Sequence, residues 1–318
     1  MKPRTLLNLA AGIILLASCS QHKAEQVKLH RFEQFLFEGS GSEPTAHGAE
    51  FASPLLNYYP EDATYMAMLH DFTTDPVVRD IYHTTDSLYH DLGWLEQQLS
   101  QALQRAGKLC PSIRYDRFYT LLTADFDNYQ NRVYCNDHEL AISIDRYAVG
   151  AMPQYQYFGL PSYLLRLSTR DHILPDCMAA IARAQILLPE GQMTLLDYAI
   201  AEGKTLYFLE QTLPHTPDTL RLRYSKEQLD WMRQNTENVW SWLIQNRMLY
   251  STDLATLRNL TDDAPKTNAF GEGSAPRTAG YIGLQIVRAY MKKSHTSMQE
   301  LFEDTDSQKI LNQSAWRP

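Results

Sequence analysis

The residues of this sequence that could do chemistry gather on a predicted helix, Thr194–Leu213, which contains Glu202, Lys204 and Tyr207. A carboxylate such as that of Glu202 is a potential ligand of a hydrolytic zinc ion. Such a site also needs two histidines one helical turn apart, commonly in an H-E-x-x-H helix whose glutamate activates the metal-bound water. The sequence has no H-E-x-x-H, and residues 175–184, on the preceding predicted helix, contain no histidine. Glu202 alone cannot hold zinc, so we predict no metal ligand set and no catalytic residue.

The ten histidines offer no replacement for the missing pair. His83 and His90 lie two helical turns apart, which separates their rings by about 10 Å along the axis, too far to chelate one ion. We therefore expect both on the surface. His138 and Glu139 adjoin at a predicted strand start, where a ligand pair is the less favoured interpretation. Because the sequence also lacks G-x-S-x-G, Walker and G-x-G-x-x-G motifs, serine-hydrolase and nucleotide chemistry have no local signal.

Aromatic side chains could form a ligand platform on the predicted helix Ser225–Arg247. Trp231, Trp240, Trp242 and, just beyond it, Tyr250 follow near-helical spacing. Such stripes are more often part of the core than a binding surface, so we expect them in the core.

Three cysteines follow residue 19, namely Cys110, Cys135 and Cys177. An odd number allows at most one disulfide within the chain, and no C-x-x-C pair indicates a structural zinc site. Buried free thiols are favoured over a Cys110–Cys135 bridge, because free cysteine packs as a small apolar side chain.

The elements that must position these residues are mainly helices. Two β-type runs, Phe118–Leu122 and Leu140–Ile144, predict a strand pair or small sheet. Asp75-Pro76 is typical of an N-cap with proline at the first helical position, and it opens a predicted amphipathic helix that ends at about Ala106. Further helices are predicted over Pro175–Leu188, Thr194–Leu213, Ser225–Arg247 and Tyr281–Lys293, and Ser225-x-x-Gln228 predicts a capping box. The predicted fold class is therefore α+β, predominantly helical, with one small β-sheet.

The N-terminus indicates export and a lipid anchor. Lys2 and Arg4 precede an apolar run of twelve residues, 6–17, which is shorter than the about 20 residues that span a membrane. The run ends at Leu16-Ala17-Ser18-Cys19, which is typical of a bacterial lipoprotein signal peptide over residues 1–18 with lipid attachment at Cys19. A diacylglycerol and an acyl chain such as palmitate on one cysteine anchor a protein almost permanently. We expect a lipidated tether over residues 19–27 and a single globular domain over residues 28–318.

The charge of the mature chain limits its partners. Removal of residues 1–18 leaves 27 Lys and Arg against 37 Asp and Glu, a net charge of about −10. Because that balance repels a phosphate backbone, we expect no nucleic-acid partner. The expected partners are membrane lipid, through acylated Cys19, and envelope proteins. Ser20 and Gln21, with no aspartate directly after Cys19, favour outer-membrane sorting, and the lack of a short acidic surface signal favours the periplasmic face.

Several motif segments are spread over most of the mature chain. They are Arg31-Phe32-Glu33, Ile144–Tyr147, Pro161–Tyr163, Leu195–Phe208, Leu213-Pro214, Tyr224–Trp231, Asp263–Thr267 and Arg277–Val287. Together these segments resemble the gliding motility lipoprotein family GldB of the Bacteroidota, and the predicted lipid-modified cysteine agrees with that family's pattern.

That family is in turn similar to predicted zinc-dependent, gluzincin-like proteases with H-E-x-x-H upstream of an E-G-x-x-x-Y-F helix and a glycine-tyrosine helix near the C-terminus. Glu202, Tyr207 and Tyr281 fit the two downstream helices, whereas the histidines are missing. The resemblance implies a gluzincin-protease-like scaffold without its metal or any cofactor, a pseudoenzyme that supports gliding motility or type IX secretion by binding envelope proteins. It also implies a vestigial or ligand-contact site that contains Glu202, Lys204, Tyr207, Asp145 and Tyr281.

Two other functions stay open. A cryptic metal-dependent hydrolase, a peptidase, would draw unusual ligands from Asp145, Glu202 and a histidine elsewhere in the chain. A nutrient-capture lipoprotein would use the tryptophan-rich helix as a platform for glycans.

Overall fold

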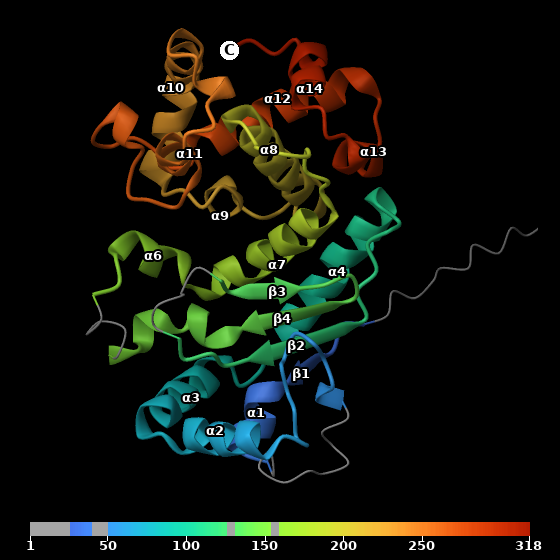
Figure 1. Ribbon diagram of the computed structural model, residues 1–318, viewed down its shortest axis with the longest axis vertical. Helices are drawn as coiled ribbons and strands as arrows, with labels where there is room; N and C mark the ends of the chain where they lie inside the picture. Colours follow the sequence, from blue (N-terminus) through green and yellow to red (C-terminus); the bar gives the residue numbers. More distant parts are fainter. Residues whose placement is uncertain (1–25, 40–49, 126–130, 154–158) are drawn as a thin grey trace, which may run out of the picture.

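The computed structural model describes residues 26–39, 50–125, 131–153 and 159–318, and it is predominantly helical with one small mixed sheet (Figure 1). Helix accounts for 62% and strand for 6%, which confirms the predicted helix-rich class with one small sheet. The predicted signal peptide and Cys19 lie outside the described residues. Among the described residues, no helix is long and apolar enough to cross a membrane.

The sheet contains four short strands in the spatial order β1-β2-β4-β3. Their bounds are β1 Leu29–Arg31, β2 Arg117–Leu121, β3 Val133–Cys135 and β4 Glu139–Ser143. β1 and β4 both pair with β2 in parallel, and β3 pairs with β4 in antiparallel orientation. The two predicted strands are confirmed to within one residue. The sequence pattern missed β1 and β3, because three residues are too few to show a strand periodicity.

The edge strand β1 has hydrogen-bond partners on both sides. On one side it pairs with β2, where His30 lies opposite Tyr119. On the other side the Val27 N–H donates to Ser100 Oγ at 2.9 Å, and the Leu29 N–H donates to Glu96 Oε1 at 2.8 Å. Both acceptors lie on α4 (Gly93–Leu109). Helix side chains thereby satisfy amides that an edge strand would otherwise leave open.

The predicted helix from Pro76 to about Ala106 is two helices, α3 (Pro76–Tyr89) and α4. Asp75 caps α3 as predicted, since its carboxylate accepts the Val77 and Val78 N–H groups. The chain turns over residues 90–92, and Asp91 Oδ1 accepts the Gly93 N–H at 2.8 Å where α4 begins. Hydrophobic spacing continues across this turn, which is why the sequence predicted one helix.

The molecule has helices on both sides of the sheet along its long axis. In Figure 1, α1 (Phe32–Phe37), α2 (Ala63–Thr74) and α3 lie at one end, and α8 to α14 lie at the other. His83 and His90, on α3 and at its end, are exposed as expected.

α7 (Arg170–Gln185) begins five residues before the predicted start at Pro175, so that prediction is wrong. A proline inside a helix removes the hydrogen bond to the carbonyl four residues earlier. Two contacts hold the first turn instead. The local one is between Thr169 Oγ1 and His172 Nδ1, at 2.9 Å. The other is tertiary, since the Arg170 guanidinium lies 4.0 Å from the Trp94 ring centroid on α4, and it leaves no local sequence signal.

The other long helices follow the predictions closely. α8 (Leu195–Thr212) and α10 (Lys226–Gln245) lie within one or two residues of their predicted bounds, and Ser225 and Gln228 form the predicted capping box on α10. α12 (Thr278–Ser294) begins three residues before the predicted start. The shorter helices in this half are α6 (Ser162–Leu167), α9 (Asp218–Arg221), α11 (Leu254–Thr261), α13 (Met298–Glu303) and α14 (Ser307–Ser314).

The aromatic stripe of α10 is only partly in the core. Trp231, Trp240 and Trp242 are partly buried and pack against the main hydrophobic core. Tyr250 is 60% exposed, so the expectation of a core position is wrong for this residue. It lies beyond the end of α10, where the helical spacing no longer governs the direction of its side chain.

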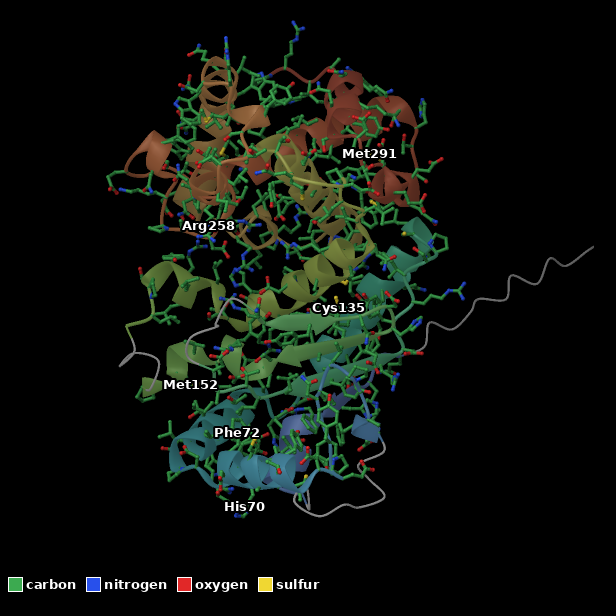
Figure 2. All side chains as sticks on the ribbon, in the orientation of Figure 1. His70, Phe72, Cys135, Met152, Arg258 and Met291 are labelled. Atoms are coloured by element: carbon green, nitrogen blue, oxygen red, sulfur yellow. The ribbon has the colours of Figure 1, made fainter. Side chains whose placement is uncertain are left out.

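The cysteines and the His138-Glu139 pair play no joint role. Cys110, Cys135 and Cys177 are free thiols, and Cys135 on β3 lies beside α7, with its Sγ 3.5 Å from the Ala180 carbonyl oxygen (Figure 2). His138 is exposed, whereas Glu139 is buried and pairs with Arg117 at 2.7 Å. The two neighbours therefore do not form a ligand pair.

α8 and α12 cross at glycines with their backbones in contact. A Cβ atom at Gly283 would overlap the Ala199 carbonyl of α8, and one at Gly203 would overlap the backbone of Gly283. Only glycine fits either position, because the atoms that a side chain would meet belong to the main chain and cannot rotate away. The two glycines thus set the distance between the helices.

We predict that Gly283→Ala destabilises the protein by about 2 kcal/mol or more, because it forces the two backbones apart. Gly107 on α4 is the matched control, since a Cβ there has nothing within 4 Å. Gly107→Ala should stabilise the protein by about 0.5–1 kcal/mol, which is the difference in helix propensity. Urea unfolding followed by circular dichroism measures both changes. If Gly283→Ala unfolds at the same urea concentration as the wild type, the helices do not touch as described.

Candidate functional site

Charged side chains from distant parts of the chain meet where α7, α8 and α12 converge, and we name this group the arginine–acid cluster. Its members are four arginines, Arg132, Arg183, Arg223 and Arg277, and three acids, Asp176, Glu202 and Asp263. They come from the chain before β3, from α7 and α8, and from the segments that precede α10, follow α11 and precede α12. Tertiary folding, and no local motif, assembles the cluster.

Arg223 is the centre of the cluster. Its Nη1 lies 2.5 Å from Asp176 Oδ1, and its Nη2 lies 2.9 Å from Asp263 Oδ2. Arg132 Nη1 lies 3.6 Å from the second Asp176 oxygen. The backbone of Arg223 has a φ of 60°, in the left-handed region that residues other than glycine rarely adopt. The two carboxylates therefore hold a turn that the backbone alone disfavours.

Glu202 is bound by two guanidinium groups. Arg277 pairs with its Oε1, and Arg183 Nη2 lies 3.2 Å from its Oε2. Arg277 Nη1 also lies 3.7 Å from Asp263 Oδ1, which joins Glu202 to the centre of the cluster. Gly280 on α12 makes room for Glu202, since a Cβ at that position would lie 2.8 Å from Glu202 Cγ.

The arginines keep the three acids ionised. Burial raises the pKa of Asp263, but Arg223 and Arg277 together lower it by more than burial raises it. The net result is a pKa well below the usual value. Burial likewise raises the pKa values of Asp176 and Glu202, and their neighbouring arginines again produce a net lowering. Carboxylates with lowered pKa values are weak general bases and hold no proton to donate at neutral pH. The three carboxylates of the cluster therefore stay negatively charged and are poorly suited to general acid–base catalysis.

Two neutral side chains border the cluster. Tyr147 Oη donates to Asp176 Oδ2 at 3.0 Å, and burial, reinforced by Asp176, raises the pKa of the phenol. Burial lowers the pKa of His172 to about 4; Asp176 opposes this shift and the nearby arginines reinforce it. The His172 Nε2 atom is buried and has no hydrogen-bond partner among the described residues. His172 is therefore neutral at pH 7.

Only Glu202 of the five predicted site residues belongs to the cluster. Lys204 Nζ donates to the Asp304 carbonyl at 2.6 Å, and burial lowers the pKa of this amine to about 8. Tyr207 is partly buried against the hydrophobic core, and Tyr281 is buried on α12. The structure does not bring Lys204 to Glu202, because residues two apart on a helix project in different directions.

Asp145, the fifth predicted residue, fastens the end of the sheet. It is fully buried in a short 3₁₀ turn after β4, Ile144–Tyr147. Its carboxylate accepts the Thr123 N–H at 3.3 Å, the Ala124 N–H at 3.1 Å and the Ser143 hydroxyl at 2.8 Å. These bonds join the chain that leaves β2 to the chain that leaves β4, which is a structural role.

The residues around Glu202 do not fit a zinc site. Both Glu202 oxygens already accept hydrogen bonds from arginines, and Asp145 is engaged elsewhere. Within residues 26–39, 50–125, 131–153 and 159–318, no group of three or more His, Cys, Asp or Glu side chains could hold a metal ion. The ligand set of Asp145, Glu202 and a histidine is therefore not assembled in the described part of the chain.

Sequence analysis missed every arginine of the cluster. Asp263 and Arg277 open two of the motif segments quoted above, which is the signal that could have found them. Asp176 and Arg183 lie on α7, whose sequence lacks the expected histidine pair and shows no other motif. Their pairing with Arg223 and Glu202 crosses 47 and 19 residues of sequence, and no periodicity reveals such contacts.

A cavity of about 240 Å³ lies against Glu202 and Arg183. Its walls are mainly apolar, and they include Ile186, Leu188, Met193, Tyr198 and Ala201. A second void of about 20 Å³ also touches Glu202 and Arg183, and it is lined in part by Arg221 and Arg277. That volume holds about one water molecule. The site thus combines an apolar cavity with a cluster that has one more positive than negative charge.

Comparison with protein families gives a match over almost the whole chain. The family model described as gliding motility protein GldB matches residues 17–318, which include Cys19 and every member of the cluster. The name of that model also marks a lipoprotein family. No curated protein and no solved structure matches the chain. The resemblance to the GldB family is therefore confirmed.

We predict that His172 makes the folded protein sensitive to acid. The unfolded chain takes up its proton near pH 6.5, whereas folded His172 stays neutral until about pH 4. Stability is therefore lost as the pH falls through this range, by about 2 kcal/mol between pH 7 and pH 4.5. His172→Phe cannot take up this proton. Between pH 7 and pH 4.5 its free energy of unfolding should therefore fall by about 2 kcal/mol less than that of the wild type.

Urea unfolding at the two pH values measures this difference. His83→Phe, which replaces an exposed histidine on α3, is the matched control and should keep the pH dependence of the wild type. Equal pH dependence of the wild type and His172→Phe would show that His172 is not held neutral.

Proposed function

Because the chain belongs to the family of gliding motility protein GldB, we propose that it is a lipid-anchored envelope protein that supports gliding or the associated type IX secretion machinery. It does so by binding other envelope proteins and without catalysis. Cys19 carries the lipid, and the body of the protein stands on the periplasmic face of the outer membrane. No metal or other cofactor takes part.

One observation carries the proposal of binding over catalysis. Glu202, the carboxylate best placed for chemistry, is held between Arg277 and Arg183, and its pKa is lowered. In a hydrolase the same carboxylate would have to ligate a metal or take a proton from water. Two guanidinium groups occupy its oxygens instead. This arrangement supports a gluzincin-like scaffold in which fixed positive charges stand near Glu202 in place of a metal.

The cluster also supports a preformed binding surface. Largely buried ion pairs join α7 to the segment before α10, and α8 to the segment before α12, so these elements cannot move apart without separating the charges. A buried charge that loses its partner is left uncompensated in a poorly solvated site, which opposes such movement. A surface that is rigid before binding loses less conformational entropy when a partner docks.

We predict that the protein purified without chelator or histidine tag contains no stoichiometric zinc, because the arginines already occupy the oxygens of Glu202. Elemental analysis of residues 21–318 measures the metal content, and Glu202→Gln should leave it unchanged. Stoichiometric zinc that disappears in Glu202→Gln would contradict the proposal. It would support the metal-dependent peptidase instead.

We predict that Cys19→Ala moves the protein from the membrane fraction of its host to the soluble fraction, because the lipid attachment is lost. Cys135→Ala, which removes a half-buried thiol of the folded body, is the control and should stay with the membrane. Crosslinking in intact cells should then capture envelope proteins with the wild type and lose them with Cys19→Ala. A Cys19→Ala protein that still sediments with membranes would show that the anchor lies elsewhere.

A further inference from the structure

The cavity against Glu202 has mainly apolar walls, and its lining includes the half-exposed Arg183, whose pairing with Glu202 engages only one of its three nitrogen atoms. We propose that this cavity binds the carboxyl-terminal residue of a partner polypeptide. The apolar side chain of that residue fills the cavity, and its terminal carboxylate pairs with Arg183. This inference rests on the proposed protein-binding function and defines the feature of the partner that is recognised.

The apolar walls of the cavity match an apolar side chain on the last residue of the partner. Leu188 is 53% exposed and Tyr198 is 39% exposed, and Ile186 and Met193 line the same cavity. Large apolar side chains that gather around a hollow indicate a binding surface, unlike single exposed ones. The volume of about 240 Å³ is below the roughly 300–1,000 Å³ of pockets for drug-sized ligands, so it suits one large side chain.

Arg183 is the group that would bind the terminal carboxylate of the partner. Its side chain is 53% exposed, and only its Nη2 contacts Glu202. Its Nε and Nη1 make no hydrogen bond to any residue that the structure describes. Because Glu202 brings one negative charge between two arginines, Arg183 and Arg277, the group keeps one positive charge in excess. Free N–H groups on a guanidinium match the geometry of a carboxylate.

The lining favours a chain end over an internal segment. An internal segment would bring backbone N–H and C=O groups on both sides of the bound residue, and each would need a partner. The Thr205 and Thr261 hydroxyls in the lining already donate to the Ala201 and Leu257 carbonyls of their own helices. A carboxyl-terminal residue carries its side chain and its carboxylate on one carbon atom, so both fit one small cavity. Capture of a terminal carboxylate is a known mode of peptide recognition.

A fatty acid shares the chemistry of a carboxylate on an apolar group, but its chain needs more space than one side chain. The cavity has a volume of only about 240 Å³, and a carboxylate, that of Glu202, already stands in its lining. Size therefore favours the polypeptide, and the experiment below includes a short fatty acid as a competitor.

The test uses the full-length protein in phosphatidylcholine nanodiscs and fluorescein-labelled peptides that share one Gly/Ser-rich sequence and differ in the last residue. The peptides end in leucine, phenylalanine, alanine or lysine, each with a free carboxylate or a terminal amide. Fluorescence polarisation should show the tightest binding for free carboxylates after leucine or phenylalanine. Amidation should weaken that binding about tenfold or more, because a charge-assisted hydrogen bond is lost.

Three variants test the assignment of residues. Arg183→Gln removes the accessible charge and leaves Glu202 paired with Arg277, so it should bind free and amidated peptides equally weakly. Ala201→Phe places a ring in the cavity and should abolish binding of both forms. Arg258→Gln removes an exposed charge from α11 and should bind as the wild type does (Figure 2). Melting curves by circular dichroism establish that each variant is folded.

Equal affinity of the wild type for free and amidated peptides would overturn the proposal, as would wild-type binding by Arg183→Gln. Tighter binding of octanoate than of any peptide would overturn the assignment to a polypeptide. Crosslinking in cells separates this failure from failure of the proposed function. Capture of the same envelope proteins by the wild type, Arg183→Gln and Ala201→Phe would reject only the cavity, whereas no capture by the wild type would reject protein binding itself.

Discussion

The backbone contact between α8 and α12 determines where the charges of the cluster lie. Glu202 directly precedes Gly203 on α8, and Arg277 directly precedes α12, which carries Gly280 and Gly283 in its first two turns. When the glycines let the two backbones touch, Glu202 and Arg277 come within reach of each other across the crossing. Helices that pack through side chains stay about 8–10 Å apart. At that separation the same carboxylate and guanidinium would need other partners.

The ion pairs of the cluster also hold two backbone conformations that are unfavourable on their own. Arg223 and Arg277 each have a positive φ, and each stands just before a long helix. Such a conformation costs about 1 kcal/mol or more for a residue with a side chain, so it persists only where the surroundings hold it. Here the acids Asp176, Asp263 and Glu202 do so by binding the two side chains. The direction in which α10 and α12 leave the cluster therefore depends on ion pairs made by the residues that precede them.

The sequence predicts features that depend on neighbouring residues, such as helix caps. It does not predict features that depend on contacts between distant parts of the chain. The capping box that starts at Ser225 depends on residues four or fewer apart, and it was predicted. The start of α7 ahead of Pro175 depends on contacts with other elements, and it was predicted wrongly. Glu202 was found from its helix motif, but its partners Arg183 and Arg277 were not. Arg277 reaches Glu202 across the α8–α12 crossing, and Arg183 reaches it from α7, and no local pattern contains either contact.

The pairing of β1 has a mechanical consequence under the N-terminal anchor that we propose. Tension on the N-terminus would enter the folded body along β1, which lies parallel to β2 and whose Leu29 is bonded on the other side to Glu96, as Val27 just before the strand is to Ser100. A pull along a strand bonded in this way loads its hydrogen bonds together, in shear. A hairpin strand such as β3, peeled from one end, would lose its bonds one after another. The N-terminal strand is thus arranged to pass force into the sheet, which is what the lipid anchor that we propose at Cys19 would need.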